Sequence, residues 1–460
     1  MLKRKVDEYL NIWHLNRKQA LLIKGARQIG KTFSIKEFGN KNFKNVIEVN
    51  FLLNPSLIQS YYAIKDYKQL ILRLSTLYGQ KLVPGETLIF FDEIQVLYEK
   101  REEDKRNGRL DSSLSDLITL MKEAVINGEY RFILSGSLLG ITLNSIKSFP
   151  VGYLDEYQMF PLDFEEFLWA KGVGDDVINY VYECFNYKEK VDDVINNSLL
   201  EYFKEYVIIG GMPEVVETYI NTNNLYLVDI AQKQIVNNYK SDIITYIHNE
   251  EKKLRVKDIY DSIPSELNSK NKRFISSHVI DKNYLKNYNL QDEFLWLTNA
   301  GVAIPVYNVS DPVLPLVLSS NRKTLKLFMN DIGLLGSMLL QTGIKEKILN
   351  NELTINYGAP YENVIAQELY SHGFDGKLFY YNSKSNGEVD FIIEYDNEIL
   401  PIEVKSGKPN EMNYYNHCVL NKLISNYNIN NAYVFGMTNI KKENDFIYNL
   451  PLYMIAFIKK

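Results

Sequence analysis

The segment Gly25–Thr32 constrains the fold of this chain more than any other, because it fits the pattern G-x-x-x-x-G-K-[ST] of a phosphate-binding loop. The apolar run Ala20–Ile23 before it predicts a strand, and the segment Thr32–Phe38 after it predicts a helix. Such a loop requires this order of strand, glycine loop and helix. The alternative is a glycine-rich turn with an exposed lysine, which we disfavour because a second motif follows downstream.

The backbone of this loop carries most of its predicted chemistry. Gly25 and Gly30 allow conformations that a Cβ atom would forbid, so that successive N–H groups and the start of the helix can point at phosphates. We expect Lys31 to pair with the β- and γ-phosphates of ATP and the Thr32 hydroxyl to ligate Mg²⁺. The residues predicted to contact the nucleotide are Gly25, Ala26, Arg27, Gln28, Ile29, Gly30, Lys31, Thr32 and Phe33.

The second motif, Thr87–Glu93, is an apolar run that ends in two carboxylates. Buried parallel strands are apolar on both faces, and an open α/β sheet binds its ligands at their carboxyl ends. We expect Asp92 to hold Mg²⁺, mostly through water, and Glu93 to polarise the attacking water. A strand that ends in Asp-Glu is common by itself, so this interpretation depends on its position after the glycine loop.

A third segment, Arg131–Ser137, is another predicted buried strand, and it ends in small polar residues. Its carboxyl end is expected beside the glycine loop, where a hydroxyl group can sense the γ-phosphate or orient water. Ser135 and Ser137 are therefore candidate catalytic sensors. The alternative is that these serines only cap the next helix.

Composition limits the classes of function. The 460-residue chain has 57 acidic and 52 basic side chains and a formal net charge of -5, which argues against non-specific nucleic-acid binding by the whole surface but allows a local basic groove. Cys184 and Cys418 are too far apart for a disulfide framework or zinc cluster and favour a reducing cytoplasm. No stretch resembles a membrane span or a leader, so we expect an unexported protein without membrane contact.

Apolar periodicity predicts the other elements of the first part of the chain. A short amphipathic helix is expected within residues 1–19, a strand at Val46–Phe51 and one helix over Leu57–Tyr78. The segment Tyr98–Gly108 has mixed charge and no apolar anchor, which predicts a solvated loop. Helical spacing from Leu114 to Val125 predicts a covering helix.

Together these motifs resemble a family of bacterial and archaeal AAA-type ATPases that carry a characteristic C-terminal region of unknown function. The resemblance implies ATP hydrolysis and, because such enzymes often complete their sites from a neighbour, a homo-oligomer. Many members have a basic residue after the glycine that corresponds to Gly152, whereas this chain has Tyr153, so no arginine finger is assigned although Arg27 is nearby. The matching segments are Gly25–Thr32, Phe91–Gln95, Leu134–Ser137, Met159–Leu168, Gly210–Glu214 and Phe328–Leu335.

The middle of the chain, from about Asp175 to Asn330, is predicted to be mostly helical. One helix covers Leu254–Ile263, and a later helix gives way to a strand-like run within Leu295–Tyr307. Two helices and a short ribbon form a winged-helix pattern, which the resemblance also implies. The basic residues between these elements are Lys270, Lys272 and Arg273. They are candidate contacts for DNA phosphates, and a solvated loop is the favoured alternative.

From Tyr357 onward, short strands surround one helix and resemble the restriction-endonuclease-like nuclease core. Side chains alternate along a strand, so Glu403 and Lys405 share one face, and the neighbouring hairpin strand can bring Asp390 alongside. With Glu362 from the helix, these carboxylates are predicted to bind Mg²⁺, and Lys405 to activate or position water for phosphodiester attack. The alternative is a nuclease fold that serves only as a binding module.

The sequence thus predicts an α/β multidomain protein. We expect a P-loop AAA-type ATPase domain with a parallel sheet at 1–172, a helical and winged-helix region at 173–340 and a restriction-endonuclease-like α/β domain at 341–460. The first functional hypothesis is an ATPase coupled to nucleic-acid binding or cleavage. The second is a nucleotide-dependent switch or adaptor whose inactive nuclease-like fold binds DNA or another partner.

Overall fold

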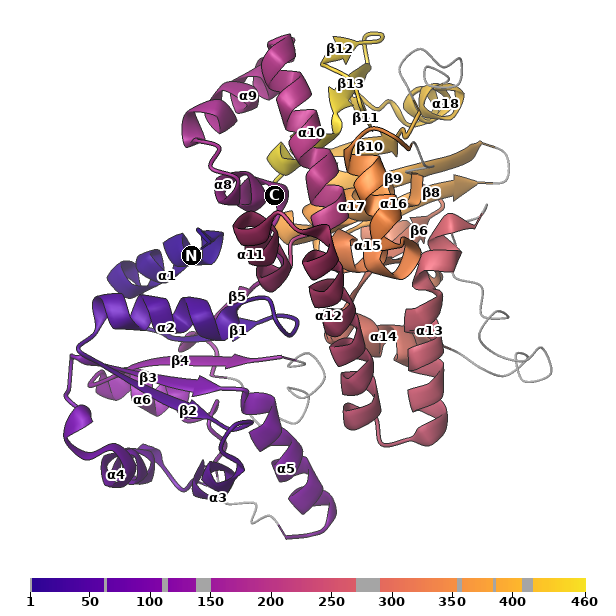
Figure 1. The fold of residues 1–460 in the computed structure, drawn as a ribbon. Coiled ribbons are helices and arrows are strands. Elements are labelled where there is room, and N and C mark those ends of the chain that lie inside the picture. Colours follow the sequence, from indigo (N-terminus) through magenta and orange to yellow (C-terminus); the bar gives the residue numbers. More distant parts are fainter. Residues whose placement is uncertain are drawn as a thin grey trace. The chain divides into compact units, whose positions relative to one another are not determined.

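The computed structural model describes residues 2–61, 64–109, 115–137, 150–269, 290–353, 358–383, 386–407 and 417–460. These residues divide into two compact units (Figure 1). The N-terminal unit comprises Lys3–Phe160 and Asn299–Gly301, and the C-terminal unit comprises Met1–Leu2, Pro161–Thr298 and Val302–Lys460.

The N-terminal unit is built on a parallel sheet with the strand order β2-β3-β4-β1-β5. Its strands are β1 (Ala20–Lys24), β2 (Asn45–Asn50), β3 (Thr87–Asp92), β4 (Arg131–Gly136) and β5 (Leu154–Gln158). Because all strands run the same way, their carboxyl ends meet at one edge, where both predicted motifs end. The predicted parallel α/β fold of this region is confirmed.

Helices cover both faces of this sheet. They are α1 (Lys5–Asn16), α2 (Lys31–Asn42), α3 (Ile58–Tyr61), α4 (Tyr67–Tyr78), α5 (Ile94–Arg106) and α6 (Met121–Asn127). Alternate strand residues, such as Ile89 and Phe91, pack with α3, α4 and α6 in one apolar core. Helix α2 contacts β2, β3 and β4, and α1 packs against α2 (Figure 1).

Two predictions for this unit are wrong. The expected helix over 57–78 is interrupted, because Asp66 caps α4 by accepting a hydrogen bond from the Gln69 amide and Ile64 forms a β-bridge with Ser115. The expected loop at 98–108 lies mostly in α5, because Tyr98 is buried and its hydroxyl donates to Asp116 Oδ1 at 2.8 Å. Long-range contacts therefore supply the anchor that this charged segment lacks locally.

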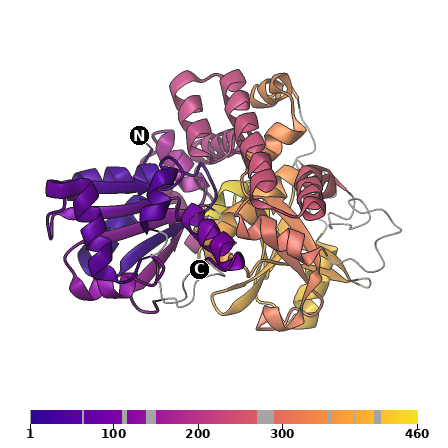
Figure 2. The ribbon, with the colours of Figure 1, turned by 90° about the horizontal axis from the view of Figure 1, so that it is seen from below.

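The C-terminal unit contains a mixed sheet with the order β12-β13-β11-β10-β9-β8-β6-β7. Figure 2 shows its orange and yellow strands from below. Neighbours β6/β8, β10/β11 and β11/β13 are parallel, and the other pairs are antiparallel. The strands are β6 (Ala303–Val309), β7 (Ser320–Met329), β8 (Phe379–Ser383), β9 (Gly387–Tyr395), β10 (Glu398–Val404), β11 (Ala432–Gly436), β12 (Lys441–Lys442) and β13 (Ile447–Pro451).

Helices precede, interrupt and follow these strands, so the mostly helical character predicted for the middle of the chain is present. None of the helices in the described ranges has the length and apolar character needed to cross a membrane. The helices are α8 (Phe164–Ala170), α9 (Asp175–Tyr187), α10 (Asp193–Ile209), α11 (Pro213–Thr222), α12 (Leu225–Tyr246), α13 (Glu250–Asn268), α14 (Gln291–Asn299), α15 (Ile332–Leu339), α16 (Thr342–Leu349), α17 (Gly358–Leu369) and α18 (Cys418–Tyr427).

The winged-helix and restriction-endonuclease-like arrangements are not confirmed. The ribbon β6–β7 exists, but β6 also pairs with β8 and so joins the sheet of the last part of the chain. Lys270, Lys272 and Arg273, the predicted DNA contacts, lie outside the described residues. The boundaries 1–172, 173–340 and 341–460 remain a prediction.

Candidate functional site

The glycine loop connects β1 to α2 through two backbone positions that suit glycine. Gly25 has a φ of +149°, and a Cβ atom there would lie 2.3 Å from the carbonyl oxygen of Met159. Gly30, immediately before α2, has a φ of +93°. Positive φ and close backbone approach are both costly for other residues, so the loop geometry explains the glycine spacing.

Lys31 begins α2, and its buried side chain turns back into the loop. Its ammonium donates hydrogen bonds to the carbonyl oxygens of Gly25 at 3.0 Å and Ala26 at 2.6 Å. Burial lowers the pKa of Lys31 to about 8, against the opposing effect of the carboxylates of Glu93 and Asp92. The loop therefore holds a cation through backbone dipoles, without a direct ion pair to either carboxylate.

Asp92 ends β3 and is buried at the centre of a group of neutral donors. Its Oδ2 atom accepts hydrogen bonds from the Thr32 hydroxyl at 2.8 Å and the Asn50 amide at 2.9 Å, and its Oδ1 atom accepts from the Ser135 hydroxyl. Burial raises the pKa of Asp92, and the Ser135 and Thr32 hydroxyls oppose this only in part. The structure thus brings the predicted magnesium ligands Thr32 and Asp92 into contact.

Glu93 follows in the left-handed region, with a φ of +54°, directly before α5. This conformation is uncommon for residues other than glycine and often occurs at functional sites. The Glu93 carboxylate accepts hydrogen bonds from the Ser137 hydroxyl at 3.1 Å and from the Gln95 side-chain amide. The same Gln95 nitrogen also donates to Ser137 Oγ at 3.1 Å, so three side chains form one connected group.

Sequence reasoning missed three residues of this site. Asn50 pairs with Asp92 in the β2/β3 register, and a polar residue at the end of a parallel strand was a usable signal for it. Gln95 is the second residue of α5. Arg4 donates to the carbonyl oxygens of Ile29 at 3.0 Å and Phe160 at 2.8 Å, and nothing near it in the sequence indicates that role.

The other predicted nucleotide contacts differ in their exposure. Ile29 is buried, Gln28 has a φ of +63°, and Arg27 is half-buried near Glu99. Burial raises the pKa of Glu99 to about 7, and the Arg27 guanidinium opposes this shift. Phe33 is 55% exposed on the first turn of α2. Its ring is therefore accessible from solvent.

Three of the predicted C-terminal site residues, Asp390, Glu403 and Lys405, lie together. Asp390 on β9 accepts a hydrogen bond from the Val404 amide at 2.9 Å, and Lys405 Nζ lies 2.8 Å from Glu403 Oε1. Burial and the nearby Asp390 carboxylate raise the pKa of Glu403 to about 7, against the opposing effect of Lys405. Glu362 is buried on α17.

A lysine that sequence reasoning missed lies among these carboxylates. Lys326 on β7 is fully buried, and its Nζ atom is 2.7 Å from Glu388 Oε1. Burial lowers the pKa of Lys326, but the carboxylates of Glu362, Asp390 and Glu388 outweigh it, so that this pKa lies above its usual value. Within the described ranges, no three or more His, Cys, Asp or Glu residues are grouped so that they could hold a metal ion. Mg²⁺ binding by Glu362, Asp390 and Glu403 stays a prediction.

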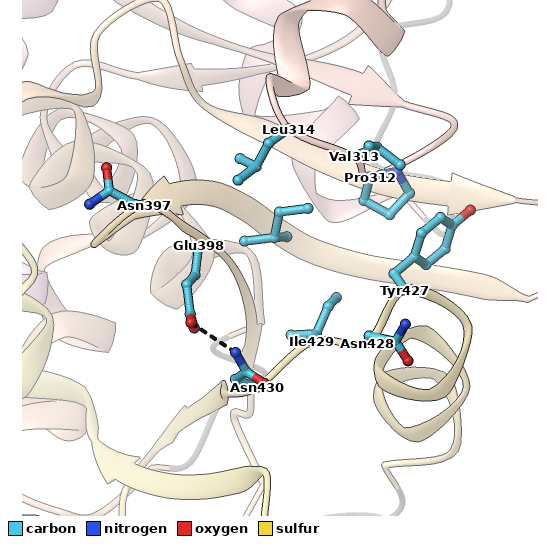
Figure 3. Close-up of a pocket in the computed structure, with 10 residues that line it drawn as sticks. Pro312, Val313, Leu314, Asn397, Glu398, Tyr427, Asn428, Ile429 and Asn430 are labelled. Carbon is cyan, nitrogen blue, oxygen red and sulfur yellow. Dashed lines mark hydrogen bonds between the residues drawn. The ribbon is translucent and has the colours of Figure 1, made fainter.

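A separate pocket of about 330 Å³ lies in the C-terminal unit between the segment after β6, the β9–β10 turn and the end of α18 (Figure 3). Leu314, Ile399 and Ile429 contribute apolar surface, and a 2.8 Å hydrogen bond joins Glu398 to Asn430. None of its lining residues is a predicted site residue. The residues that line this pocket are thus different from those of both carboxylate sites.

Comparison with known families supports the first part of this interpretation. Residues 17–168 match the model of an AAA domain, whereas residues 200–346 and 357–454 match two domains of unknown function, DUF8612 and DUF4143. A curated relative, the uncharacterized protein MJ1544 of Methanocaldococcus jannaschii, is 25% identical over 438 residues, which cover 89% of this chain and 80% of that protein.

Among solved structures, the Walker-type ATPase PABY2304 of Pyrococcus abyssi is 15% identical with a TM-score of 0.41, covering 74% of this chain and 96% of its own. Two further structures are more distant. PCH-2 of C. elegans is 12% identical with a TM-score of 0.25, and the match covers 48% of this chain and 58% of that one. The Aeropyrum pernix ORC1 protein in complex with DNA is 12% identical with a TM-score of 0.25, and the match covers 76% of this chain and 93% of that one. These three likenesses are too weak to carry an argument. The family match and the parallel P-loop sheet together show that the chain carries an AAA-type ATPase domain, followed by regions of unknown function.

Proposed function

We propose that this protein binds ATP with Mg²⁺ at Gly25–Thr32 and hydrolyses the β–γ phosphoanhydride bond. The observation that carries the proposal is the contact between the Thr32 hydroxyl and Asp92 beside the buried Lys31 ammonium. The group fits the ligand, because the loop offers a cation, backbone donors and a hydroxyl–carboxylate pair of the kind that holds Mg²⁺. The AAA family match supports the same class of reaction.

Each side chain has a proposed role in the reaction. Lys31 exchanges its two carbonyl contacts for the β- and γ-phosphates. Thr32 and Asp92 would hold Mg²⁺, which would neutralise charge on the phosphates. Glu93 accepts a proton from the water that attacks the γ-phosphorus atom, and ADP leaves. Ser137 holds Glu93 and Ser135 holds Asp92 in position.

Saturation binding of labelled ATP with Mg²⁺, measured alongside turnover, tests this proposal. In Glu93→Gln we expect ATP affinity within about twofold of the parent and turnover reduced by roughly 10²- to 10⁴-fold, because only proton transfer is affected. Glu103→Gln, at an exposed position of α5, the helix that follows Glu93, is the control and should leave both unchanged. Parental turnover by Glu93→Gln would require a different base, and the absence of saturable ATP binding by the parent would overturn the proposal.

We further propose that the C-terminal unit couples the ATPase to nucleic acid. The specific observation is that Asp390 on β9 and Glu403 on β10 lie together with Lys405, which directly follows β10, as a phosphodiester-cleaving site of the restriction-endonuclease-like type requires. The competing function is a nucleotide-dependent switch or adaptor in which this fold only binds DNA or a partner.

Turnover with and without DNA distinguishes these two functions. DNA-stimulated turnover and cleavage of single- or double-stranded DNA with Mg²⁺ or Mn²⁺, lost in Lys405→Ala, support coupling to cleavage. Slow turnover that DNA does not change supports the switch. Equal cleavage by the parent and Lys405→Ala would remove the proposed nuclease site.

The proposal extends to assembly and location. A second copy of the chain would complete the ATP site, but no residue is assigned as its arginine finger, because Tyr153 stands where many members of the resembled family carry a basic residue. Both cysteines are free thiols, which supports a reducing cytoplasmic location. Sedimentation with and without ATP tests the assembly.

A further inference from the structure

Lys326 contacts residues of the C-terminal carboxylate cluster from an unexpected direction. It lies on β7, and in the sheet order the strands β6 and β8 separate β7 from β9. Its buried side chain nevertheless places Nζ 2.7 Å from Glu388 Oε1 on β9 and 4.9 Å from the centre of the Tyr380 ring on β8. The ammonium therefore crosses the face of the sheet to reach the cluster.

The position of Lys326 matters because two buried carboxylates act on its charge. Glu362 on α17 and Asp390 on β9 are both buried, and both act on Lys326 electrostatically. Buried like charges repel each other unless a cation lies among them. A buried ammonium is equally costly unless carboxylates surround it. Lys326 and these carboxylates thus compensate one another.

The second lysine of the cluster is already engaged. Lys405 pairs with Glu403 at 2.8 Å, and both side chains are partly exposed at the margin of the site. In the described part of the chain, Lys405 pairs with Glu403 at the margin, and Lys326 pairs with Glu388 from the buried side. Lys326 on β7 therefore brings a fully buried positive charge to the cluster.

We propose that Lys326 is the resident cation of this cluster and fills the role that the sequence assigned to a divalent metal ion. The C-terminal unit then folds without metal, and a divalent ion binds there only in competition with the ammonium. The inference concerns the proposed cleavage site, but its test measures metal binding and not cleavage, so the two can fail separately.

The test measures Mn²⁺ binding by the full chain without nucleotide, using electron paramagnetic resonance of free Mn²⁺ and thermal unfolding. All variants carry Asp92→Asn to weaken metal binding at the P-loop, and this chain is the reference. Lys326→Met should bind Mn²⁺ about tenfold more tightly than the reference, because a competing charge is removed from the cluster. Mn²⁺ should raise the unfolding temperature of Lys326→Met but not that of the reference, and adding Asp390→Asn should abolish both effects.

Lys345→Met is the matched control, because Lys345 is also fully buried in this unit and pairs with the buried Asp229 at 2.8 Å. It should lower the unfolding temperature without any gain in Mn²⁺ affinity. Lys326→Arg keeps the charge and should bind Mn²⁺ no more tightly than the reference.

Two results would overturn the inference. One is Asp390-dependent Mn²⁺ binding by the reference that is as tight as that of Lys326→Met. The other is a gain in Lys326→Arg equal to that in Lys326→Met. If Lys326→Met does not fold, Mn²⁺ binding by the reference chain is the deciding measurement. Mn²⁺ binding that depends on Asp390 would contradict the proposal, and the absence of such binding would support it.

Discussion

The two carboxylate sites of this protein stabilise their charged groups through different kinds of contact. At the P-loop, neutral groups hold the charged ones: Asp92 accepts from hydroxyls and an amide, and Lys31 donates to backbone carbonyls. In the C-terminal cluster, Lys405 pairs with Glu403 and Lys326 with Glu388. The first site therefore holds its charges through neutral groups, whereas the second pairs them directly within the fold.

The energies of the two kinds of contact explain why this difference matters. A neutral hydrogen bond stabilises a fold by only about 1 kcal/mol net, so a ligand can replace it at little cost. Removing one partner of an ion pair costs about 3–5 kcal/mol where the charge left behind is fully buried, as that of Lys326 is. The cost is smaller where both partners are partly exposed, as in the Lys405–Glu403 pair. Exchangeable contacts suit a site that must bind and release a nucleotide, while direct pairs suit a site that stabilises structure.

The largest expected effect is on ATP binding and distinguishes the two sites through Lys31 and Lys405. Lys31→Ala should weaken ATP binding by about 100-fold or more, roughly 3 kcal/mol, because it removes charge-assisted bonds to the phosphates. Lys405→Ala should leave ATP affinity unchanged, since its ammonium pairs with Glu403. Equilibrium titration with labelled ATP measures both. Equal losses in the two variants would contradict the distinction between these sites.

The next effect concerns buried charge that serves only the fold. Asp331 caps α15, and its carboxylate accepts from the amides of Gly211 at 2.6 Å and Leu334 at 3.0 Å. Burial raises the pKa of Asp331 to about 6, against these donors, whereas an unfolded Asp titrates near 3.9. The folded state thus binds the Asp331 proton more tightly than the unfolded state does. The protonated carboxyl group therefore stabilises the fold at low pH, and up to roughly 3 kcal/mol of this stability is lost as pH rises from about 4 to about 6.

Asp331→Asn tests this sign, because an amide does not titrate. The difference in unfolding free energy between the parent and this variant should change across that pH window and stay constant above about pH 7. A parallel pH dependence of the parent and Asp331→Asn would exclude Asp331 as the source.

A smaller effect sharpens the description of the P-loop site. Gln95→Ala should lower ATP turnover by about tenfold, roughly 1.4 kcal/mol, while ATP affinity stays within about twofold, because Glu93 loses a donor that orients it. Gln232→Ala removes an equally buried glutamine from the C-terminal unit and should leave turnover per folded molecule unchanged. Parallel losses of turnover and affinity in Gln95→Ala would indicate a purely structural role.

The smallest expected effect separates the two serines. Ser135 donates to Asp92 and Ser137 to Glu93. Ser135→Ala should raise the Mg²⁺ concentration needed for half-maximal turnover, and Ser137→Ala should lower turnover at saturating Mg²⁺, each by roughly fivefold for a loss of about 1 kcal/mol. Turnover measured across a Mg²⁺ series distinguishes them, and the opposite assignment would mean that the two hydroxyls act differently from their contacts.

Much of the N-terminal unit could be predicted from the sequence. The P-loop and the apolar runs around Asp92 and Ser135 are local patterns, and parallel strands bring their carboxyl ends to one edge without further information. The sequence also placed Glu403 and Lys405 together, because strand alternation is local. It failed at α5, where Tyr98 is anchored by Asp116 on a later segment.

The sequence by itself determined the glycine loop, the apolar strands that end in charged or polar residues, and the AAA class of the first domain. Only the tertiary structure brought Asn50 to Asp92, Arg4 to the backbone of the loop and Lys326 to Glu388. Periodicity and motif spacing act over a few residues, whereas a buried ammonium or guanidinium is compensated by whichever acceptors the fold brings within about 3 Å. The partners of buried charges are therefore set by how strands and helices pack.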